Sequence, residues 1–269
     1  MADPEHSFPL SDIQIFKTIV EVAYADRTGR MGAKHGELEA LRDNGKLPCS
    51  YDLFIQRGLG RYELPVMAEC LEAARDRPGT FDFLLRPRGH LRAWIEHQLG
   101  ANPELREIGA FVSRPRSADQ DEHVDNTDAS RDDYVTLFWA TDQVTNKAGG
   151  TRFFRNTAAL GPTERDALCR RLKKQRLKNR NLSITSIEGE TVRLERCQWL
   201  TFGLHTVHFG MANSGFEHPR ILGTALWARR GAADLPQNRV LQPLPAKSLR
   251  LSPLDRAVID PFADVWVSL

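Results

Sequence analysis

The chain has 269 residues, of which 41% are hydrophobic and 27% are charged, and its formal net charge is +2. A chain of this size can bury a full core as one large domain or as a domain with a helical extension, and its near-neutral balance demands neither a nucleic-acid nor a membrane partner. Its apolar runs are far shorter than the roughly 20 residues of a membrane span, and its first ten residues lack the features of a secretory signal. We therefore expect a soluble, cytoplasmic enzyme, and the scattered cysteines indicate free thiols rather than a disulfide framework.

Residues 1–104 are predicted to form an N-terminal helical layer. Ser11 begins a capping-box pattern, and the apolar residues after it recur on one helical face. These residues are Ile13, Phe16, Ile19, Val20 and Ala23. Further helices are predicted at Pro65–Arg75, where proline suits the first helical position, and at Gly89–Leu99. The turn-rich stretch 47–65 is predicted to be a loop.

From about Leu105 the pattern changes to short apolar or alternating runs separated by Gly, Pro, Asn and Asp. The runs are Leu105–Val112, Tyr134–Ala140, Thr151–Phe154, Leu182–Ile187, Thr191–Leu194, Trp199–Leu204 and Ile221–Ala228. Such spacing is typical of a β-sandwich or jelly roll. We predict a mainly β fold with α elements, in which residues 105–230 form a double-stranded β-helix (jelly-roll, cupin-like) core with the N-terminal helices packed outside. Thr163–Arg180 is predicted to be an inserted helix within about 160–181, and 231–269 a C-terminal extension packing on the core.

The functional prediction centres on His123-Val124-Asp125. In a strand, residues i and i+2 project from the same face, so His123 and Asp125 can present a nitrogen and a carboxylate to one ion. Iron(II) oxygenases use two histidines and one carboxylate on one face of an octahedron, which leaves positions open for a co-substrate and oxygen. H-x-D alone is a weak signal, and an exposed loop in the acidic stretch DQDEHVDNTD is the alternative.

The stretch 203–227, GLHTVHFGMANSGFEHPRILGTALW, adds a second histidine, an asparagine and an arginine at the head of an apolar strand. A buried arginine there suits a dicarboxylate, because its planar fork binds a carboxylate bidentately. With these elements, residues 105–228 resemble the phytanoyl-CoA dioxygenase-like family of Fe(II)/2-oxoglutarate-dependent dioxygenases. The family pattern is H-x-D, a strand with a tryptophan, a glycine turn, a distal H-x4-N and an arginine about a dozen residues after that histidine. The corresponding residues are His123, Asp125, Trp139, Gly149, Gly150, His208, Asn213 and Arg220.

The resemblance implies that His123, Asp125 and His208 bind Fe(II) and are the catalytic residues. It also implies 2-oxoglutarate and O2 as co-substrates, with release of succinate and CO2. Related halide-binding enzymes have a small residue at the carboxylate position. Because Asp125 fills that position here, the resemblance implies hydroxylation or a related oxidation, such as desaturation or cyclisation, rather than halogenation.

The resemblance further implies a co-substrate site. The far carboxylate of 2-oxoglutarate would pair with Arg220, Trp139 would line the pocket, and Asn213 would belong to the same site. This chain departs from the family in three places. Val124 replaces a residue that is often polar, RNTA follows the glycine turn where PGSH is usual, and Gly210 replaces a frequent serine. These departures leave the metal ligands intact and concern the finer co-substrate contacts.

Two other histidines compete for the role of distal ligand. His205 lies three residues before His208, and on a strand this odd offset would put the two imidazoles on opposite faces. The positions of Asn213 and Arg220 relative to His208 favour His208, and His205 is interpreted as a hydrogen-bonded residue of the barrel. His218 is interpreted as a loop residue.

Arg170–Arg180 contains seven basic residues in eleven positions. The segment could bind phosphate, a carboxylated substrate or nucleic acid. The preferred interpretation is a solvated helix face with Leu168 and Leu172 packing inward, because the segment lacks the aromatic residues on which bases stack. Arg114 and Arg116, just before the H-x-D segment, are candidate contacts for an anionic substrate, with a simple loop role as the alternative.

The sequence thus predicts an oxygenase that oxidises a small organic substrate. One alternative is a nucleic-acid- or protein-directed 2-oxoglutarate oxygenase that uses the basic insert. Another is a non-catalytic, cupin-like metal-binding sensor, and a third is a zinc hydrolase with the same three ligands. Arg220 has no obvious role in a hydrolase.

Overall fold

Two antiparallel sheets form the centre of the fold. The structure, a computed structural model, describes residues 7–32, 55–56, 60–125, 133–145, 147–178, 189–215 and 218–232. The larger sheet has the strand order β1-β2-β3-β9-β4-β7, and the smaller sheet has the order β6-β5-β8. The strands are β1 (Ile55–Gln56), β2 (Arg61–Pro65), β3 (Glu104–Ser113), β4 (Tyr134–Ala140), β5 (Thr151–Phe153), β6 (Glu190–Val192), β7 (Trp199–Gly203), β8 (His208–Gly210) and β9 (Arg220–Ala228).

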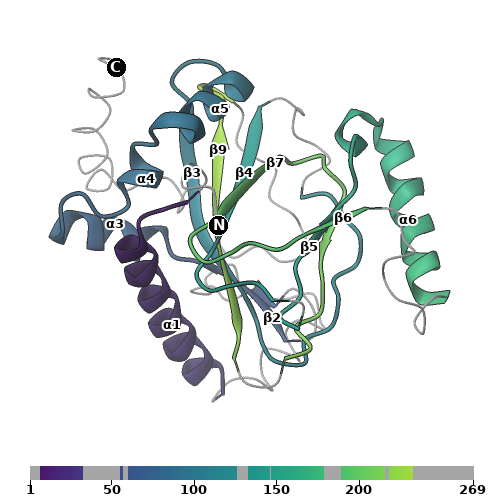
Figure 1. Cartoon of the computed structure of the whole chain (residues 1–269), viewed down its shortest axis with the longest axis horizontal. Coiled ribbons are helices and arrows are strands. Elements are labelled where there is room, and N and C mark those ends of the chain that lie inside the picture. The colour runs from purple at the N-terminus through teal and green to yellow at the C-terminus, as the bar shows by residue number, and fades with distance from the viewer. Residues whose placement is uncertain are drawn as a thin grey trace.

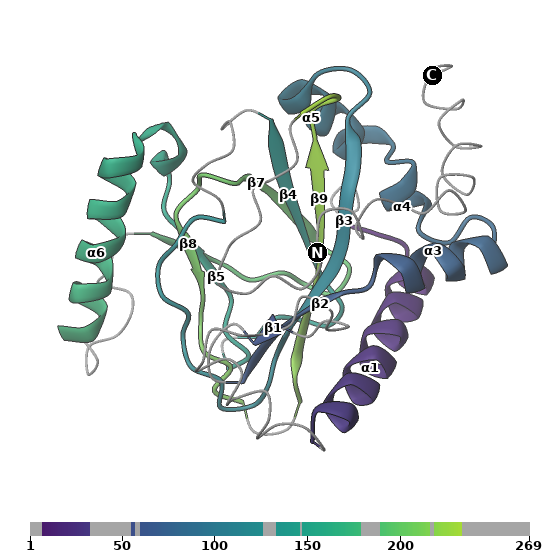
Figure 2. The same ribbon diagram turned by 180° about the vertical axis from the view of Figure 1, so that it is seen from behind.

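Helices lie on the outer sides of both sheets (Figures 1 and 2). The larger sheet is flanked by α1 (Leu10–Gly32), α3 (Met67–Asp76), α4 (Asp82–Leu85) and α5 (Gly89–Leu99). On the opposite side of the molecule, α6 (Pro162–Lys178) lies beside the smaller sheet, where Leu172 packs against Phe154 and Phe209. No helix within the described ranges is long and apolar enough to span a bilayer.

Strand alternation sorts the residues of the larger sheet into two faces. On the outer face, Ile108 of β3 and Trp139 of β4 pack with Phe16 of α1 in the main hydrophobic core. On the inner face, Phe138 of β4 and Phe202 of β7 pack with Phe153 of the smaller sheet. The two sheets therefore face each other across an aromatic core. The predicted mainly β, jelly-roll fold with helices packed outside is confirmed.

The N-terminal part differs from its prediction because it supplies strands as well as helices. Pro65 ends β2, which pairs with β3, and the following helix starts only at Met67. The turn-rich sequence at 47–65 indicated a loop, so the pairing of β2 with β1 and β3 was not predicted. Ser11 lies inside α1 with its hydroxyl on Asp12, so it is not the predicted cap.

Some predicted elements match closely and others cannot be compared. α5 has the predicted bounds, and α6 covers the predicted insert up to its last described residue. β8 was not predicted, since three residues are too few to show an alternating pattern. The predicted strand Leu182–Ile187 and residues 233–269 lie outside the described residues. Cys70, Cys169 and Cys197 are free, as predicted, whereas Cys49 lies outside the described residues.

Candidate functional site

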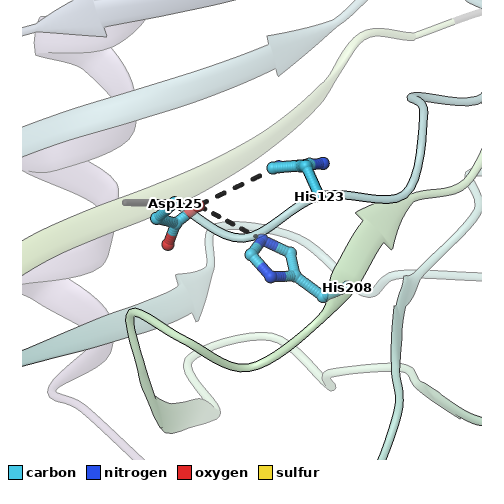
Figure 3. Close-up of side chains that lie close together, drawn as sticks. All are labelled: His123, Asp125 and His208. Carbon is cyan, nitrogen blue, oxygen red and sulfur yellow. Dashed lines mark ion pairs between the residues drawn. The ribbon is translucent and has the colours of Figure 1, made fainter. Parts of the chain in front are cut away.

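Three side chains form a potential metal-ligand group on the inner side of the smaller sheet (Figure 3). One ligand atom from each of His123, Asp125 and His208 lies within 4.8 Å of the others. Asp125 Oδ1 is 3.4 Å from His208 Nε2 and 3.9 Å from His123 Nε2. The fold thus brings His208 close to His123 and Asp125, although more than 80 residues separate them in the sequence.

Backbone pairing positions the two histidines opposite each other. His123 and His208 exchange both backbone hydrogen bonds, at 3.0 and 2.9 Å, in an isolated antiparallel bridge. The predicted strand at H-x-D is therefore reduced to this bridge, with Asp125 N donating to Leu204 O at 3.1 Å. His123 and Asp125 still converge, because an extended backbone projects residues i and i+2 to the same side.

Each imidazole is oriented by a second contact. His123 Nδ1 lies 2.7 Å from Asp121 O, and His208 Nδ1 lies 2.9 Å from Thr206 O. A neutral imidazole that donates Nδ1–H to a carbonyl keeps the lone pair on Nε2, which is the atom that faces the group. This is the tautomer required of a metal ligand.

The carboxylate completes a donor set suited to a divalent transition metal. Asp125 Oδ2 accepts a hydrogen bond from the Thr136 hydroxyl at 3.4 Å, which leaves Oδ1 facing the two histidines. The His208 side chain is 4% exposed, whereas those of His123 and Asp125 are 37% and 30% exposed. Three ligands on one side and solvent on the other match a facial arrangement with open coordination positions.

The electrostatics of the group favour a cation. Burial lowers the pKa of His208, but the charge and hydrogen bond of Asp125 together with the hydrogen bond to the Thr206 carbonyl outweigh burial and hold the pKa above its ordinary value. A position between this carboxylate and the two Nε2 atoms therefore stabilises positive charge. A bound metal ion would take the place of the proton.

Aromatic side chains form the inner wall behind His208. The rings of Phe153 and Phe202 lie 5.5 and 4.9 Å from the His208 ring, and Phe138 packs on Phe202 at 4.9 Å. The sequence analysis did not assign these residues to the site. Their inward alternation on β4, β5 and β7 could have indicated them.

Arg220 begins β9 on the inner face and is 7% exposed. Its Nη1 donates to Gly149 O at 2.6 Å and to Ala148 O at 3.0 Å, and its Nη2 donates to Ser113 Oγ at 3.1 Å. Its Nε is buried without a hydrogen-bond partner among the described residues. The predicted co-substrate residue is therefore a buried cation that donates to carbonyls and a hydroxyl.

The glycine turn has a backbone reason to consist of glycine. A Cβ on Gly149, where φ is +70°, would lie 2.3 Å from Ala212 O, and a Cβ on Gly150 would lie 2.3 Å from Val192 O. Neither backbone oxygen can move without disturbing the neighbouring chain. Without side chains, the turn can pack closely against the neighbouring backbone, and its carbonyls accept hydrogen bonds from Arg220.

Asn213 is buried in the loop between β8 and β9. Its side-chain amide donates to Ser113 O at 3.0 Å and to His218 O at 3.1 Å, and its Oδ1 accepts from Gly215 N. Since both ends of the amide are occupied by backbone groups, Asn213 holds the loop that leads to Arg220. The structure thus places it beside the predicted co-substrate site as a support for the loop.

Trp139 is not brought to this site. It is fully buried on the outer face of β4, with its ring 4.8 Å from Phe16 and 6.0 Å from Phe83. A Cβ on Gly223 of β9 would fall on the indole, so this glycine gives the ring its space. The predicted contact of Trp139 with the co-substrate is corrected, because strand alternation points Phe138, and not Trp139, inward.

The other candidate residues are not members of the metal-ligand group. Arg114 and Arg116 are exposed at the end of β3, and a hydrogen bond with Tyr62 raises the pKa of Arg114. His205 is buried in the turn between β7 and β8, so the strand alternation expected between it and His208 does not apply there. His218 lies in the loop before β9, as predicted.

α6 holds the acidic segment that precedes His123. Arg176 donates to Glu122 at 2.9 Å and to Asp121 at 3.0 Å, and Lys173 donates to Asp121 at 2.6 Å. Arg176 also lies 3.6 Å from Asp119. We refer to Lys173, Arg176, Asp119, Asp121 and Glu122 as the α6 clasp. Leu168 and Leu172 pack inward as predicted, but Arg176 is not part of a solvated face, since its side chain is 14% exposed.

Arg61 of β2 is a buried residue that the sequence analysis missed. It donates Nη1 to Ser113 Oγ at 3.0 Å and Nε to Ala118 O at 2.7 Å, and its Nη2 donates to Met211 O. Its position in a stretch predicted to be a loop gave no reason to place it beside Arg220.

Comparisons with known proteins support the fold. No protein-family model matches the chain, and no curated protein matches its sequence. Among solved structures, the non-heme α-ketoglutarate dependent epimerase SnoN from nogalamycin biosynthesis matches with a TM-score of 0.50 and 17% identity, over 77% of this chain and 76% of that chain. AviO1 from Streptomyces viridochromogenes Tue57 matches with a TM-score of 0.49 and 16% identity, over 78% of this chain and 88% of that one. The likeness to SnoN shows a shared fold.

Proposed function

We propose that this chain is an Fe(II)- and 2-oxoglutarate-dependent oxygenase that oxidises a small organic substrate. The observation that carries the proposal is the combination of a His-Asp-His group, open on one side, with a buried arginine within the same barrel. A shared fold does not by itself establish an activity. The shared fold with a protein named as α-ketoglutarate dependent nevertheless adds support to this choice of co-substrate.

The proposed roles follow from the contacts. His123 and His208 would bind iron through Nε2, and Asp125 would bind it through Oδ1, because the other polar atoms of these side chains are held by carbonyls and Thr136. When bound, iron(II) and 2-oxoglutarate would supply the oxidising chemistry, with O2 consumed and succinate and CO2 released. The phenylalanines behind His208 would keep water from the inner side of the site.

Arg220 favours an oxygenase over a hydrolase or a passive metal sensor. Three protein ligands and an open position also suit zinc. However, neither a zinc hydrolase nor a sensor needs a buried guanidinium inside the barrel, whereas a dicarboxylate co-substrate needs a cation for its distal end. We therefore assign Arg220 to the distal carboxylate of 2-oxoglutarate.

A small-molecule substrate is favoured by the α6 clasp. Lys173 and Arg176 already pair with Asp121 and Glu122, so these two cations of the basic segment are neutralised within the chain. A nucleic-acid docking surface would instead present cations to phosphates. Hydroxylation is the outcome that we propose, because Asp125 occupies the third ligand position.

The test is anaerobic absorption spectroscopy of the protein with iron(II) and 2-oxoglutarate. We expect a metal-to-ligand charge-transfer band that requires both components. His208→Ala should lose the band and the metal, whereas His205→Ala, the matched control three residues away, should keep both. A protein that binds iron(II) but gives no band with 2-oxoglutarate would contradict the proposal, and a band that depends on His205 would reverse the ligand assignment.

A further inference from the structure

Arg61 and Arg220 flank the same serine across three strands. The register pairs Arg61 of β2 with Ser113 of β3 and pairs Ser113 with Arg220 of β9. Directly paired residues project to the same face of a sheet. The three side chains therefore form a row across the inner face of the larger sheet.

The two guanidinium groups converge on shared acceptors. Ser113 Oγ accepts from Arg61 Nη1 at 3.0 Å and from Arg220 Nη2 at 3.1 Å. Met211 O also accepts from both arginines. A hydroxyl oxygen that accepts two hydrogen bonds still has its own hydrogen to donate. We refer to Arg61, Ser113 and Arg220 as the arginine cradle.

The arginine cradle makes no ion pair with a carboxylate among the described residues. All other acceptors of the two guanidinium groups are backbone carbonyls. Asp119 is the acid that acts on Arg61, but its oxygens already accept from Ala212 N and lie beside Arg176. Arg61 and Arg220 are 5% and 7% exposed, so solvent does not screen them effectively.

Two buried like charges are costly without an anion. Burial lowers the pKa of Arg61 to about 10, against the opposing effect of Asp119. Burial and the charge of Arg61 together lower the pKa of Arg220 to about 9. Each guanidinium has five N–H donors, and Arg220 Nε is one that remains without an acceptor. The arginine cradle therefore has both the charge and the donors to receive a carboxylate.

We infer that Arg61 is a second co-substrate-binding residue, and that Arg61 and Arg220 hold the distal carboxylate of 2-oxoglutarate between them. This inference rests on the function proposed above and extends it, because it makes the N-terminal strand β2 part of the catalytic site. It also makes Arg61 a determinant of specificity for a dicarboxylate over a 2-oxo acid that lacks the distal carboxylate.

Because Gly210 has no side chain, it leaves space for the guanidinium of Arg61. A Cβ on Gly210 would lie 2.8 Å from Arg61 Nη1 and 2.5 Å from Gln120 Oε1. Gly210 also lies two residues after His208 on β8, so the two positions share a face and are separated by about 6.6 Å along the strand. The arginine cradle is thus reached from the metal-ligand group along one face of β8. The family that this chain resembles often has a serine at the position of Gly210. In this chain the glycine leaves room for a guanidinium group.

The test compares two 2-oxo acids by isothermal titration calorimetry on the Ni(II)-loaded protein. The ligands are 2-oxoglutarate and 2-oxobutyrate, which lacks the distal carboxylate. Arg61→Met should weaken 2-oxoglutarate binding by about ten- to a hundredfold while leaving 2-oxobutyrate binding unchanged. Arg61→Lys should recover part of the loss, since it restores the charge without the fork.

Arg165→Met is the matched control. Arg165 is also buried and donates to Ala158 O and Leu160 O, but it lies in α6. Its replacement should leave the affinities for both 2-oxo acids unchanged. If Arg61→Met does not fold, Gly210→Ala decides the question, because it displaces the guanidinium without removing it and should selectively weaken 2-oxoglutarate.

The outcomes separate the two hypotheses. If the Ni(II)-loaded wild-type protein binds neither 2-oxo acid, the proposed function fails and this inference fails with it. If the wild type prefers 2-oxoglutarate and the Arg61 and Gly210 variants retain that preference, only the role of Arg61 is overturned. Equal loss of both 2-oxo acids in a folded variant also overturns it, because such a loss would mean that Arg61 only supports the sheet.

Discussion

The α6 clasp and the arginine cradle both place cations close to the segments that carry the metal ligands, but their charges are balanced differently. In the α6 clasp, Lys173 and Arg176 pair with carboxylates directly before His123. In the arginine cradle, neither guanidinium pairs with a carboxylate. The difference teaches how charge can be used: a neutralised group can orient a neighbouring segment, whereas a buried cation without a carboxylate partner favours the binding of an anion.

The density of basic residues along the sequence would instead suggest that the α6 clasp is the more important anion-binding region. The basic segment of α6 is conspicuous along the chain, while Arg61 and Arg220 lie 159 positions apart and meet only through β3. Burial without a carboxylate partner explains why the less conspicuous pair matters more. An exposed ion pair such as Lys173 with Asp121 contributes little because solvent screens it, whereas unpaired charges inside a barrel interact strongly with an anion that binds them.

The largest expected effect comes from removing Arg220. Arg220→Ala leaves the distal carboxylate of 2-oxoglutarate without its main partner in a desolvated site. Loss of one member of such a pair costs about 3–5 kcal/mol, so affinity for 2-oxoglutarate should fall by roughly two to three or more orders of magnitude. The measurement is titration of the iron(II) protein with 2-oxoglutarate, with metal content determined in parallel.

Metal binding should survive Arg220→Ala, because no ligand of the metal-ligand group hydrogen-bonds to Arg220. Arg220→Lys should recover only part of the loss, since one ammonium cannot reproduce the fork. Unchanged affinity in Arg220→Ala would remove the arginine cradle from the co-substrate site and erase the contrast with the α6 clasp.

The metal-ligand group was predictable only in part from its own residues, because H-x-D alone is a weak signal. His123, Asp125, His208 and Arg220 were identified through the order and spacing of the family pattern that the chain resembles. Arg61 could not be predicted, because its meaning depends on a strand register that no local pattern encodes. Trp139 shows the reverse failure, since its motif position was clear but the face to which β4 turns it depends on the packing of α1 and α4.

The fold was predictable to a similar degree. Long alternating strands such as β3, β4 and β9 were found with their bounds nearly correct. β8 was missed, and the strand expected at H-x-D is present only as the bridge at His123, although both segments carry residues of the metal-ligand group. Short paired segments are stabilised by their neighbours rather than by their own composition, so sequence periodicity does not reveal them.

An intermediate effect is expected from Arg176→Gln in the α6 clasp. Arg176 binds Glu122, whose side chain is fully buried next to His123, and its guanidinium lies over Phe209, next to His208. It therefore supports both histidine-bearing segments from outside. Loss of such outer support typically lowers metal affinity by about 10–100-fold. We expect that loss for the metal, measured by competition with a chelator, and no change in 2-oxoglutarate affinity at saturating metal.

Lys174→Gln is the matched control for Arg176→Gln, because Lys174 is an exposed cation on the same helix. It should leave metal affinity at the wild-type value. If Arg176→Gln weakened 2-oxoglutarate binding at saturating metal, the two regions would not be separable in the way that their contacts indicate.

The smallest effect is expected from Lys173→Gln, which removes the exposed ion pair with Asp121. The hydrogen bond from Lys173, the largest cause, lowers the pKa of Asp121 below its ordinary value of 3.8. Because the pKa of Asp121 is lower in the folded state, the pair stabilises the protein fully at pH values above the ordinary pKa. This stabilisation is lost as the pH falls through the folded-state pKa. For an exposed pair the contribution at neutral pH is about 0.2–1 kcal/mol, and salt screens it. Urea unfolding at pH 7 should therefore show a small loss of stability in Lys173→Gln at low salt that shrinks at 1 M NaCl.

The loss of 2-oxoglutarate affinity in Arg61→Met should respond much less to salt, because Arg61 is buried. If both losses were screened alike, the arginine cradle would behave as a solvated charge group, and burial could no longer explain why the two regions differ.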